Sequence, residues 1–226
     1  MKSSAGTSLI KTGFSDFDRL FESEGIPHGS VCLIRSSPKA SGFKFLLSVA
    51  QKNMGNSHYI TTTHSARVIS NSLKGMKTNS SEIPEVREID PRTATDVLTA
   101  VNEMELESGD VVILDSINCL VDSKRRELLD MYRELKRVAV EQGAVLVLHE
   151  VTADPHQSTP SFVDLEYMSD LLFGITVTMS DEGIFQNLWV ERLPVNVSLK
   201  ESKKKNRIIT MLDTGGRVTI NTGGSI

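Results

Sequence analysis

Short apolar segments alternate with longer amphipathic segments through the first two-thirds of this 226-residue chain. Strands are predicted at 31–35 and 110–115, around the apolar runs 31–34 and 111–114, whereas 42–53 and 125–142 repeat apolar residues every three or four positions. Strands that are apolar on both faces are typical of parallel sheets, and strand–helix alternation requires helical crossovers. The sequence therefore predicts an α/β fold: a three-layer sandwich with a mostly parallel central sheet and helices on both faces.

The rest of the chain extends this pattern and then departs from it. Further strands are predicted at 58–62, 144–149 and 171–179, and further helices at 16–21, 66–73, 93–105 and 165–170. A turn at 181–183 leads into a strand at 185–192, and residues 208–212 and 217–220 form a last hairpin. We therefore expect antiparallel strands at one edge of the sheet, a flexible lead-in over residues 1–11, and a single domain over residues 1–226.

The amino-acid composition points to no particular class of partner or function. The net charge of −4 does not require nucleic acid as a partner, and 39% hydrophobic residues is ordinary for a globular protein. Cys32 and Cys119 lie in or beside predicted strands and indicate neither a disulfide framework nor a metal site. Because no apolar run has membrane-spanning length and the N-terminus lacks the apolar segment of a secretion signal, we expect a cytoplasmic protein.

The loop between the first buried strand and the next helix stands where a phosphate-binding loop would stand. The pattern G-x-x-x-x-G-K-[ST] requires Gly, Gly, Lys and Ser or Thr at positions 37, 42, 43 and 44. This chain has Ser37, Gly42, Phe43 and Lys44 there, so only the second glycine matches. Backbone amides at the helix start can still hold an anion, but the lysine for the outer phosphates and the hydroxyl for magnesium are missing.

Four stretches of the sequence carry a family resemblance. They are residues 12–18 with 25–30 (TGFSDFD and GIPHGS), residues 31–46, residues 110–120 and residues 127–152. Together they resemble the opening motif, P-loop region, second acidic motif and following helix and strand of the KaiC/RecA/RadA superfamily, most closely its KaiC-like archaeal and bacterial paralogues. The resemblance implies a RecA-like fold, with Asp115 in the place of the family's magnesium-holding aspartate and with assembly into rings or filaments.

The residues that perform ATP hydrolysis in that family are replaced here. Phe43 stands at the lysine position, Lys44 at the Ser/Thr position, and Thr63 or His64 at the position of the glutamate that polarises water. Phosphoryl transfer depends on positioning and charge neutralisation, so three such losses should leave little turnover. Lys39 or Lys44 could replace the missing cation by turning its side chain toward the phosphates. His64 is either a substitute base or an ordinary loop histidine.

These comparisons define the candidate site residues. The candidate nucleotide-binding residues are Ser37, Lys39, Ser41, Gly42, Phe43, Lys44 and Phe45, and no catalytic residue is predicted. Asp115 is a metal ligand if magnesium nucleotide binds; otherwise it caps a turn or helix. Glu150 is either a polar sensor, as the resemblance implies, or a carboxylate on the rim where strands of such sheets end. The spacing of His149, Asp154 and His156 fits no common metal frame.

A basic cluster lies near the end of the chain, at Lys203, Lys204, Lys205 and Arg207. In recombinase-like relatives this region can face DNA or a neighbouring subunit. The other interpretation is a solvated hairpin tip, which the lack of interleaved aromatic residues favours.

The sequence as a whole favours a non-catalytic RecA/KaiC-like regulatory or scaffolding protein with a degenerate nucleotide site, a pseudo-ATPase that pairs with a RecA-like relative or another protein. It leaves two alternatives open. One is an ATP-binding protein with weak or no hydrolysis, for which ATP and Mg²⁺ would be the cofactors. The other is a DNA-binding recombination accessory similar to RadA paralogues.

Overall fold

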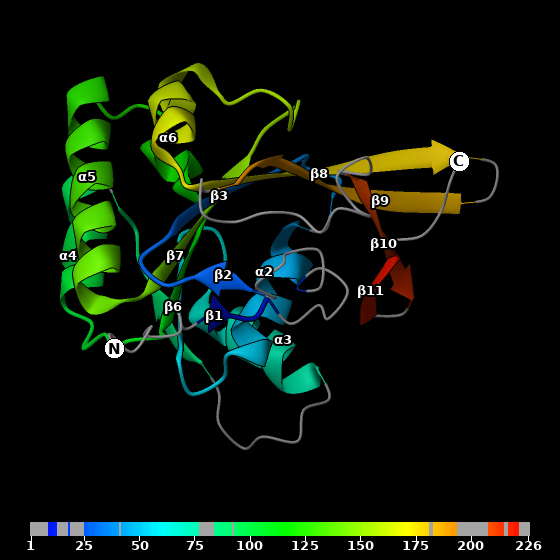
Figure 1. The fold of residues 1–226 in the computed structure, drawn as a ribbon, viewed down its shortest axis with the longest axis horizontal. Coiled ribbons are helices and arrows are strands. Elements are labelled where there is room, and N and C mark those ends of the chain that lie inside the picture. Colours follow the sequence, from blue (N-terminus) through cyan, green and yellow to red (C-terminus); the bar gives the residue numbers. More distant parts are fainter. Residues whose placement is uncertain are drawn as a thin grey trace, which may run out of the picture.

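The structure is a computed structural model that describes residues 9–12, 18, 25–40, 42–76, 84–91, 93–180, 183–193, 208–214 and 217–221 (Figure 1). The strands are β1 (Leu9–Ile10), β2 (Ile26–Pro27), β3 (Val31–Ser36), β4 (Ser57–Thr61), β5 (Glu85–Glu88), β6 (Val111–Asp115), β7 (Val145–Val151), β8 (Leu171–Ser180), β9 (Gly183–Arg192), β10 (Ile208–Thr214) and β11 (Arg217–Asn221). The helices are α2 (Gly42–Lys52), α3 (Ala66–Gly75), α4 (Ala94–Asn102), α5 (Arg125–Gln142) and α6 (Val163–Met168), with 3₁₀ turns η1 (Ile117–Leu120) and η2 (Pro160–Phe162).

Nine of these strands form one sheet, in the order β11-β10-β9-β8-β3-β7-β6-β4-β5. The strands from β8 to β5 run parallel, and β9, β10 and β11 continue the sheet in antiparallel pairing. Helices α4, α5 and α6 lie on one side of the sheet, and α2 and α3 on the other (Figure 1). The predicted three-layer α/β sandwich with an antiparallel C-terminal edge is therefore confirmed.

The structure adds three strands that the sequence did not predict, β1, β2 and β5. The edge strand β5 has the sequence EVRE, whose charges hide it from a search for apolar runs. The short β1 pairs with β2, and Ile10 is buried, so the end of the expected lead-in is structured. The predicted helix at 16–21 lies outside the described residues apart from Asp18.

Two apolar layers enclose the sheet, and strand alternation decides which side chain enters which layer. In β3, Cys32 and Ile34 pack on the side of α2 and α3, whereas Val31 and Leu33 pack on the side of α4 and α5. The other central strands divide their residues in the same way. Polar residues at the ends of these strands are therefore sorted between the two faces.

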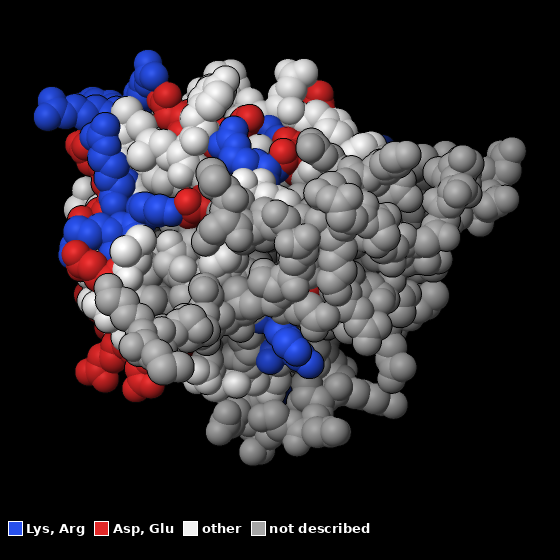
Figure 2. Space-filling view, viewed as in Figure 1, with Lys and Arg blue, Asp and Glu red and all other residues white. Residues whose placement is uncertain are grey.

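Helix α5 covers the predicted span and ends at Gly143, whose φ of 65° lies in the left-handed region that glycine adopts readily. Its outer face carries ion pairs one turn apart, such as Arg137 with Glu134 and Glu141. Figure 2 shows basic and acidic side chains interspersed over the region where α5 lies. That face therefore has no large area of one charge sign. Among the described helices, none combines the length and apolar character needed to cross a membrane.

Candidate functional site

Three strand ends place polar side chains on the face of the sheet that α2 covers. Ile34 of β3, Ile113 of β6 and Val147 of β7 all pack in that layer. The residue two positions further along each strand must face the same way. These residues are Ser36, Asp115 and His149, which lie at the carboxyl edge where ligands of α/β sheets gather.

These side chains, with Tyr59 of β4, form a hydrogen-bonded relay (Ser36, His149, Asp115 and Tyr59). Ser36 Oγ lies 2.8 Å from His149 Nε2, and His149 Nδ1 lies 2.7 Å from Asp115 Oδ1. The Tyr59 hydroxyl donates to Asp115 Oδ2 at 2.8 Å. None of the four residues is more than 3% exposed. The relay is thus a buried network in which both carboxylate oxygens of Asp115 have partners.

The charge state of Asp115 fixes the direction of these hydrogen bonds. Burial by itself would raise the pKa of Asp115, but the hydrogen bonds from His149 and Tyr59 outweigh it and hold that pKa below its ordinary value. Burial and the adjacent carboxylate raise the pKa of Tyr59 well above its usual range, so its hydroxyl keeps the proton that it donates. Because an ionised carboxylate only accepts, His149 Nδ1 must carry a proton. In the neutral ring, Nε2 then accepts from the Ser36 hydroxyl.

The first residue of α2 lies directly against this relay. A Cβ added to Gly42 would lie 2.5 Å from Ser36 Oγ and 2.7 Å from His149 Nε2. Gly42 is therefore needed for close packing, whatever its part in a phosphate-binding motif. The order Ser–His–Asp also occurs in hydrolase triads. Here Gly42 covers Ser36 Oγ, so a substrate carbonyl has no approach to the serine in this structure.

The altered loop above the relay also holds an aromatic contact. Phe43 packs against the apolar layer on the α2 side and stacks on His64, with ring centroids 4.6 Å apart. The resemblance implies a phosphate-binding lysine at the position of Phe43 and a catalytic glutamate at the position of Thr63 or His64. Thr63 Oγ1 lies 2.8 Å from His64 Nδ1 and so joins the same contact. The start of α2 is thus joined to the loop after β4 by an aromatic stack.

The other predicted loop residues are divided between the surface and the core. Lys39 and Lys44 are exposed, whereas Ser37 is half-buried and its amide donates to the carbonyl of Ile175 at 3.1 Å. Phe45 is 2% exposed and belongs to the core beneath α2. Ser41 lies outside the described residues, as do Lys203, Lys204, Lys205 and Arg207.

The residues present do not fit a magnesium ion at Asp115. One carboxylate oxygen of Asp115 is bonded to His149 and the other to Tyr59. Lys44, a cation, stands where a hydroxyl ligand would be needed. Across the described part of the chain, no group of three or more His, Cys, Asp or Glu side chains is arranged to hold a metal ion.

The opposite face of the same edge carries a second set of polar residues, the arginine cluster (Arg35, Glu150, Glu166 and Glu191). Arg35 precedes Ser36 in β3, and Glu150 follows His149 in β7, so both point away from the relay. The Arg35 side chain is fully buried, lies 3.2 Å from a Glu166 oxygen, and is also paired with Glu191. One guanidinium thus pairs with two carboxylates, and Glu150 is opposite Arg35 in the β3–β7 register.

Local backbone features bring Glu191 to Arg35. The β8–β9 register shifts at Leu172/Phe173, so that Glu191 is the extra residue of a bulge in β9. A Cβ at Gly174, which is opposite Arg35 in register, would lie 2.9 Å from Glu191 Oε1. The bulge and the glycine together leave room for this carboxylate. Burial raises the pKa of Glu191, although Arg35 and His156 partly oppose the shift.

The arginine cluster is only partly satisfied. Glu150 Oε1 accepts from the Thr159 amide at 2.6 Å, which fastens the loop after β7 to the sheet. Within the described residues, Arg35 Nε, Glu150 Oε2 and Glu191 Oε1 are buried without a hydrogen-bond partner. His156 Nδ1 lies 3.7 Å from Glu191 Oε1, which is close enough for an ion pair but too far for a hydrogen bond.

With this geometry in view, comparisons with known proteins define the family. Residues 9–223 match the model of a family of unknown function, DUF7125. The chain belongs to that family. A solved structure, that of the KaiC-like protein PH0186 from the hyperthermophilic archaeon Pyrococcus horikoshii OT3, is similar with a TM-score of 0.71 and 12% identity. The match covers 95% of this chain and 99% of that one, and it confirms the KaiC/RecA-like fold. No protein of curated function matches the chain.

Sequence reasoning placed several site residues correctly on one rim but missed how they interact. The strand pattern puts Asp115 and His149 at the ends of two strands whose carboxyl ends share one edge, but it does not reveal their pairing with Ser36 and Tyr59. Arg35 was read only as the last residue of a strand. A charged residue inside an otherwise apolar strand is the signal that would have marked it, because such a side chain needs a buried partner.

Proposed function

We propose that this chain is a non-catalytic KaiC-like subunit, which acts as a regulatory or scaffolding protein through a protein partner rather than through nucleotide hydrolysis. The observation that carries the proposal is the closed state of the altered loop. Gly42 lies on the relay, and Phe43 stacks on His64 where a lysine and a carboxylate would be required.

The expected loss of rate supports a non-catalytic role. Removing one preorganised electrostatic contact typically slows a reaction about 100-fold or more. The phosphate-binding lysine, the magnesium-binding hydroxyl and the water-polarising carboxylate are all replaced. Asp115, the remaining acidic residue, is already hydrogen-bonded through both oxygens. A fold that keeps its core but has lost these groups retains its surfaces for binding.

Titration calorimetry with ATP and Mg²⁺ tests the proposal. We expect no heat of binding and no phosphate release with the wild-type chain. Micromolar affinity would contradict the closed-site interpretation and favour the alternative of an ATP-binding protein. In that case Lys39→Ala and Lys44→Ala would be compared, because these exposed lysines are the cations nearest the loop in sequence.

A designed variant provides the matched comparison. Phe43→Lys with Lys44→Thr restores two residues of the phosphate-binding motif and removes the stack on His64. If the stack is what closes the site, this variant should gain measurable ATP affinity that the wild type lacks. Circular dichroism should show unchanged secondary structure, since Phe43 is only half-buried.

A further inference from the structure

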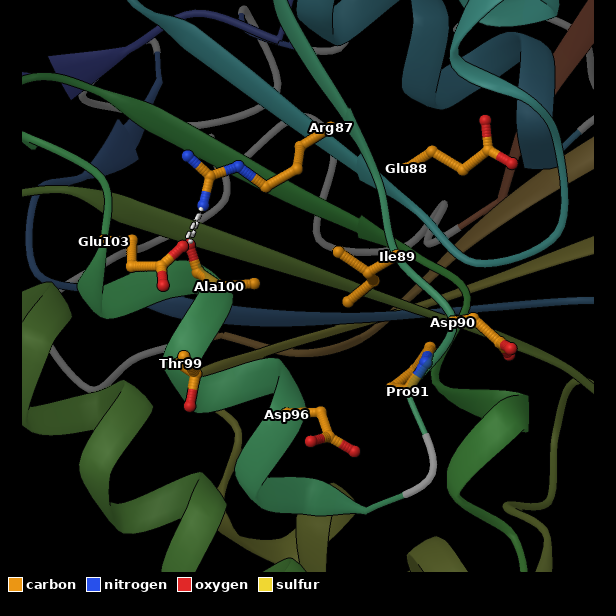
Figure 3. Close-up of a pocket in the computed structure, with 9 residues that line it drawn as sticks. All are labelled: Arg87, Glu88, Ile89, Asp90, Pro91, Asp96, Thr99, Ala100 and Glu103. Atoms are coloured by element: carbon orange, nitrogen blue, oxygen red, sulfur yellow. Dashed lines mark hydrogen bonds and ion pairs between the residues drawn. The ribbon is translucent and has the colours of Figure 1, made fainter.

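A groove of about 480 Å³ lies between the edge strand β5 and helix α4 (Figure 3). Residues 87–91 form one wall, and residues of α4 and its C-terminal end form the other. The Arg87 guanidinium joins the two walls, because it donates to the Ala100 carbonyl at 3.1 Å and to Glu103 at 2.9 Å. Figure 3 shows these bonds at the opposite end of the groove from Asp90. Arg87 therefore ties β5 to α4 at that end.

Each charged side chain of β5 fastens the strand to a different element. The sequence EVRE has little preference for a strand, and within the described part of the chain β5 pairs with β4 alone. Glu88 accepts from the Ala66 amide, at the start of α3, at 2.9 Å. Glu85 lies 3.0 Å from the ring of His58 in β4. With Arg87 bonded to α4, the edge strand depends on three polar contacts of its own side chains.

The His58 ring lies between two carboxylates. Its Nδ1 is 3.0 Å from Glu85 Oε2, and its Nε2 is 3.2 Å from Oδ2 of Asp110, directly before β6. The side chains of His58 and Asp110 are 15% and 7% exposed, whereas that of Glu85 is 51% exposed. Because ionised carboxylates only accept hydrogen bonds, the neutral ring, which has a single N–H, can donate to only one of them. The protonated ring donates to both.

The contacts of His58 continue into the groove as a charge series (Asp110, His58, Glu85, Arg87 and Glu103). Arg87 lies 3.5 Å from Glu85 and 2.9 Å from Glu103, so these two carboxylates share one guanidinium. With His58 protonated, every carboxylate of the charge series has a cation beside it. With His58 neutral, Asp110 loses that cation and Glu85 has Arg87 alone. The proton on His58 thus decides how strongly Glu85 attracts Arg87.

We propose that the proton on His58 switches the edge of the sheet between a fastened and a loosened state. With His58 protonated, β5 is tied to β4, and Arg87 stays bonded to α4. With His58 neutral, Glu85 competes with Glu103 for Arg87, so that β5 and the wall of the groove loosen together. The switch lies where β4 begins, at the opposite end of the strands from the altered loop, and it goes beyond the proposed function.

The chemistry of histidine sets the pH range of the switch. Histidine ordinarily changes charge between about pH 5 and 8, whereas Asp and Glu titrate near pH 4, so the fastened state belongs to the lower end of that range. A second histidine is close by, since a Cβ at Gly109 would lie 3.5 Å from the His28 ring. Burial lowers the pKa of His28. The Glu107 amide donates to Asp110 Oδ2 at 2.8 Å and does not titrate. The test must therefore separate His58 from His28.

Hydrogen exchange of the full chain, followed by mass spectrometry, tests the proposal. The protection factor of β5 is measured at pH 5.5 and pH 8 relative to that of the central strand β3, so that a pH effect on global stability cancels. We expect β5 to be about fivefold better protected at pH 5.5, the effect of one partly exposed ion pair. The last turn of α4 should change in the same direction, because Arg87 leaves it at the higher pH.

Variants at either end of the His58–Glu85 contact should abolish the pH effect on β5. His58→Gln cannot gain a charge, and Glu85→Gln, on an exposed side chain that the fold does not need, removes the carboxylate. His28→Gln and His156→Gln are the matched controls and should keep the fivefold difference. A wild type equally protected at both pH values, or a difference that persists in Glu85→Gln or disappears in His156→Gln, would overturn the proposal. A response of β5 without one in α4 would overturn its extension to the groove.

Discussion

At the carboxyl edge of the sheet, the polar side chains on one face are all hydrogen-bonded, whereas those on the other face are only partly so. Consecutive residues of β3, Arg35 and Ser36, point to opposite faces, and so do His149 and Glu150 of β7. On the α2 face the relay joins four side chains in an unbroken series of hydrogen bonds. On the other face the arginine cluster has three buried polar atoms without a hydrogen-bond partner among the described residues.

The comparison shows that burial alone does not decide what an ionised group contributes to stability. Asp115 is more buried than Glu191, yet its hydrogen-bond partners lower its pKa, so the fold favours its charged form. Glu191 is paired with Arg35, yet its pKa is raised because burial outweighs that pairing. Glu191 shares the Arg35 guanidinium with Glu166, and this shared charge compensates Glu191 less than the partners of Asp115 compensate that carboxylate.

The largest loss of folding stability should come from removing Arg35, the cation of the arginine cluster. Arg35→Met keeps the apolar stem but leaves Glu166 and Glu191 without the guanidinium that pairs with both. Removing one partner of a buried pair typically costs about 3–5 kcal/mol. Urea unfolding should show this loss at neutral pH as a lower transition midpoint.

Arg125→Met is the matched control for Arg35→Met. Arg125 makes two bonds to Asp164, at 2.5 and 2.8 Å, but its side chain is 77% exposed. An exposed pair contributes about 1 kcal/mol or less. Equal losses in the two variants would contradict the view that the arginine cluster is buried and interdependent.

A smaller loss is expected from Asp115→Asn, which removes the charge of the relay but preserves its shape. Hydrogen bonds to a charged group contribute about 1.5–3 kcal/mol, and part of this should be lost at neutral pH. Because the pKa of Asp115 is lowered by folding, its contribution is complete above the ordinary aspartate value of 3.8 and is lost as pH falls through the lower folded value.

Urea unfolding across pH 2–7 measures this dependence. The stability difference between wild type and Asp115→Asn should therefore shrink below about pH 4. Asp122→Asn, on an exposed residue of the loop after η1, should show almost no difference at any pH. A difference for Asp115→Asn that stays constant down to pH 2 would show that its ionisation is not coupled to folding.

The smallest effect, of opposite sign, is expected from Glu191→Gln. The raised pKa means that ionised Glu191 costs stability above its folded value, and that protonation relieves this cost as pH falls. The amide should leave stability unchanged or raise it by up to about 1 kcal/mol at pH 7, and the gain should fade toward pH 4.5. If Glu191→Gln loses as much as Asp115→Asn, the contrast between the two faces is wrong.

Most of the fold was predictable because its central strands are apolar on both faces and its helices are periodic. Helix α5 was predicted to the residue, since Gly143 marks its end. Strand β5 was missed because EVRE owes its conformation to pairing with β4 rather than to its own composition.

The site was predictable only in part. Alternation of strands and helices places Asp115 and His149 on one rim, but their hydrogen bond depends on the β6–β7 register, which pairs these two residues directly. The partners of Arg35 are 131 and 156 residues away in the sequence. No local spacing reports contacts of that kind, and only the bulge in β9 brings the second of them into place.

The dependence of both networks on one strand end has a consequence for insertions and deletions. Adding a single residue within β3 would exchange the faces of Arg35 and Ser36, so that a guanidinium would enter the imidazole side and a hydroxyl would be left among the glutamates. The relay and the arginine cluster would therefore fail together. Length variation between related sequences should therefore be tolerated in the loops around β3 and be rare inside it.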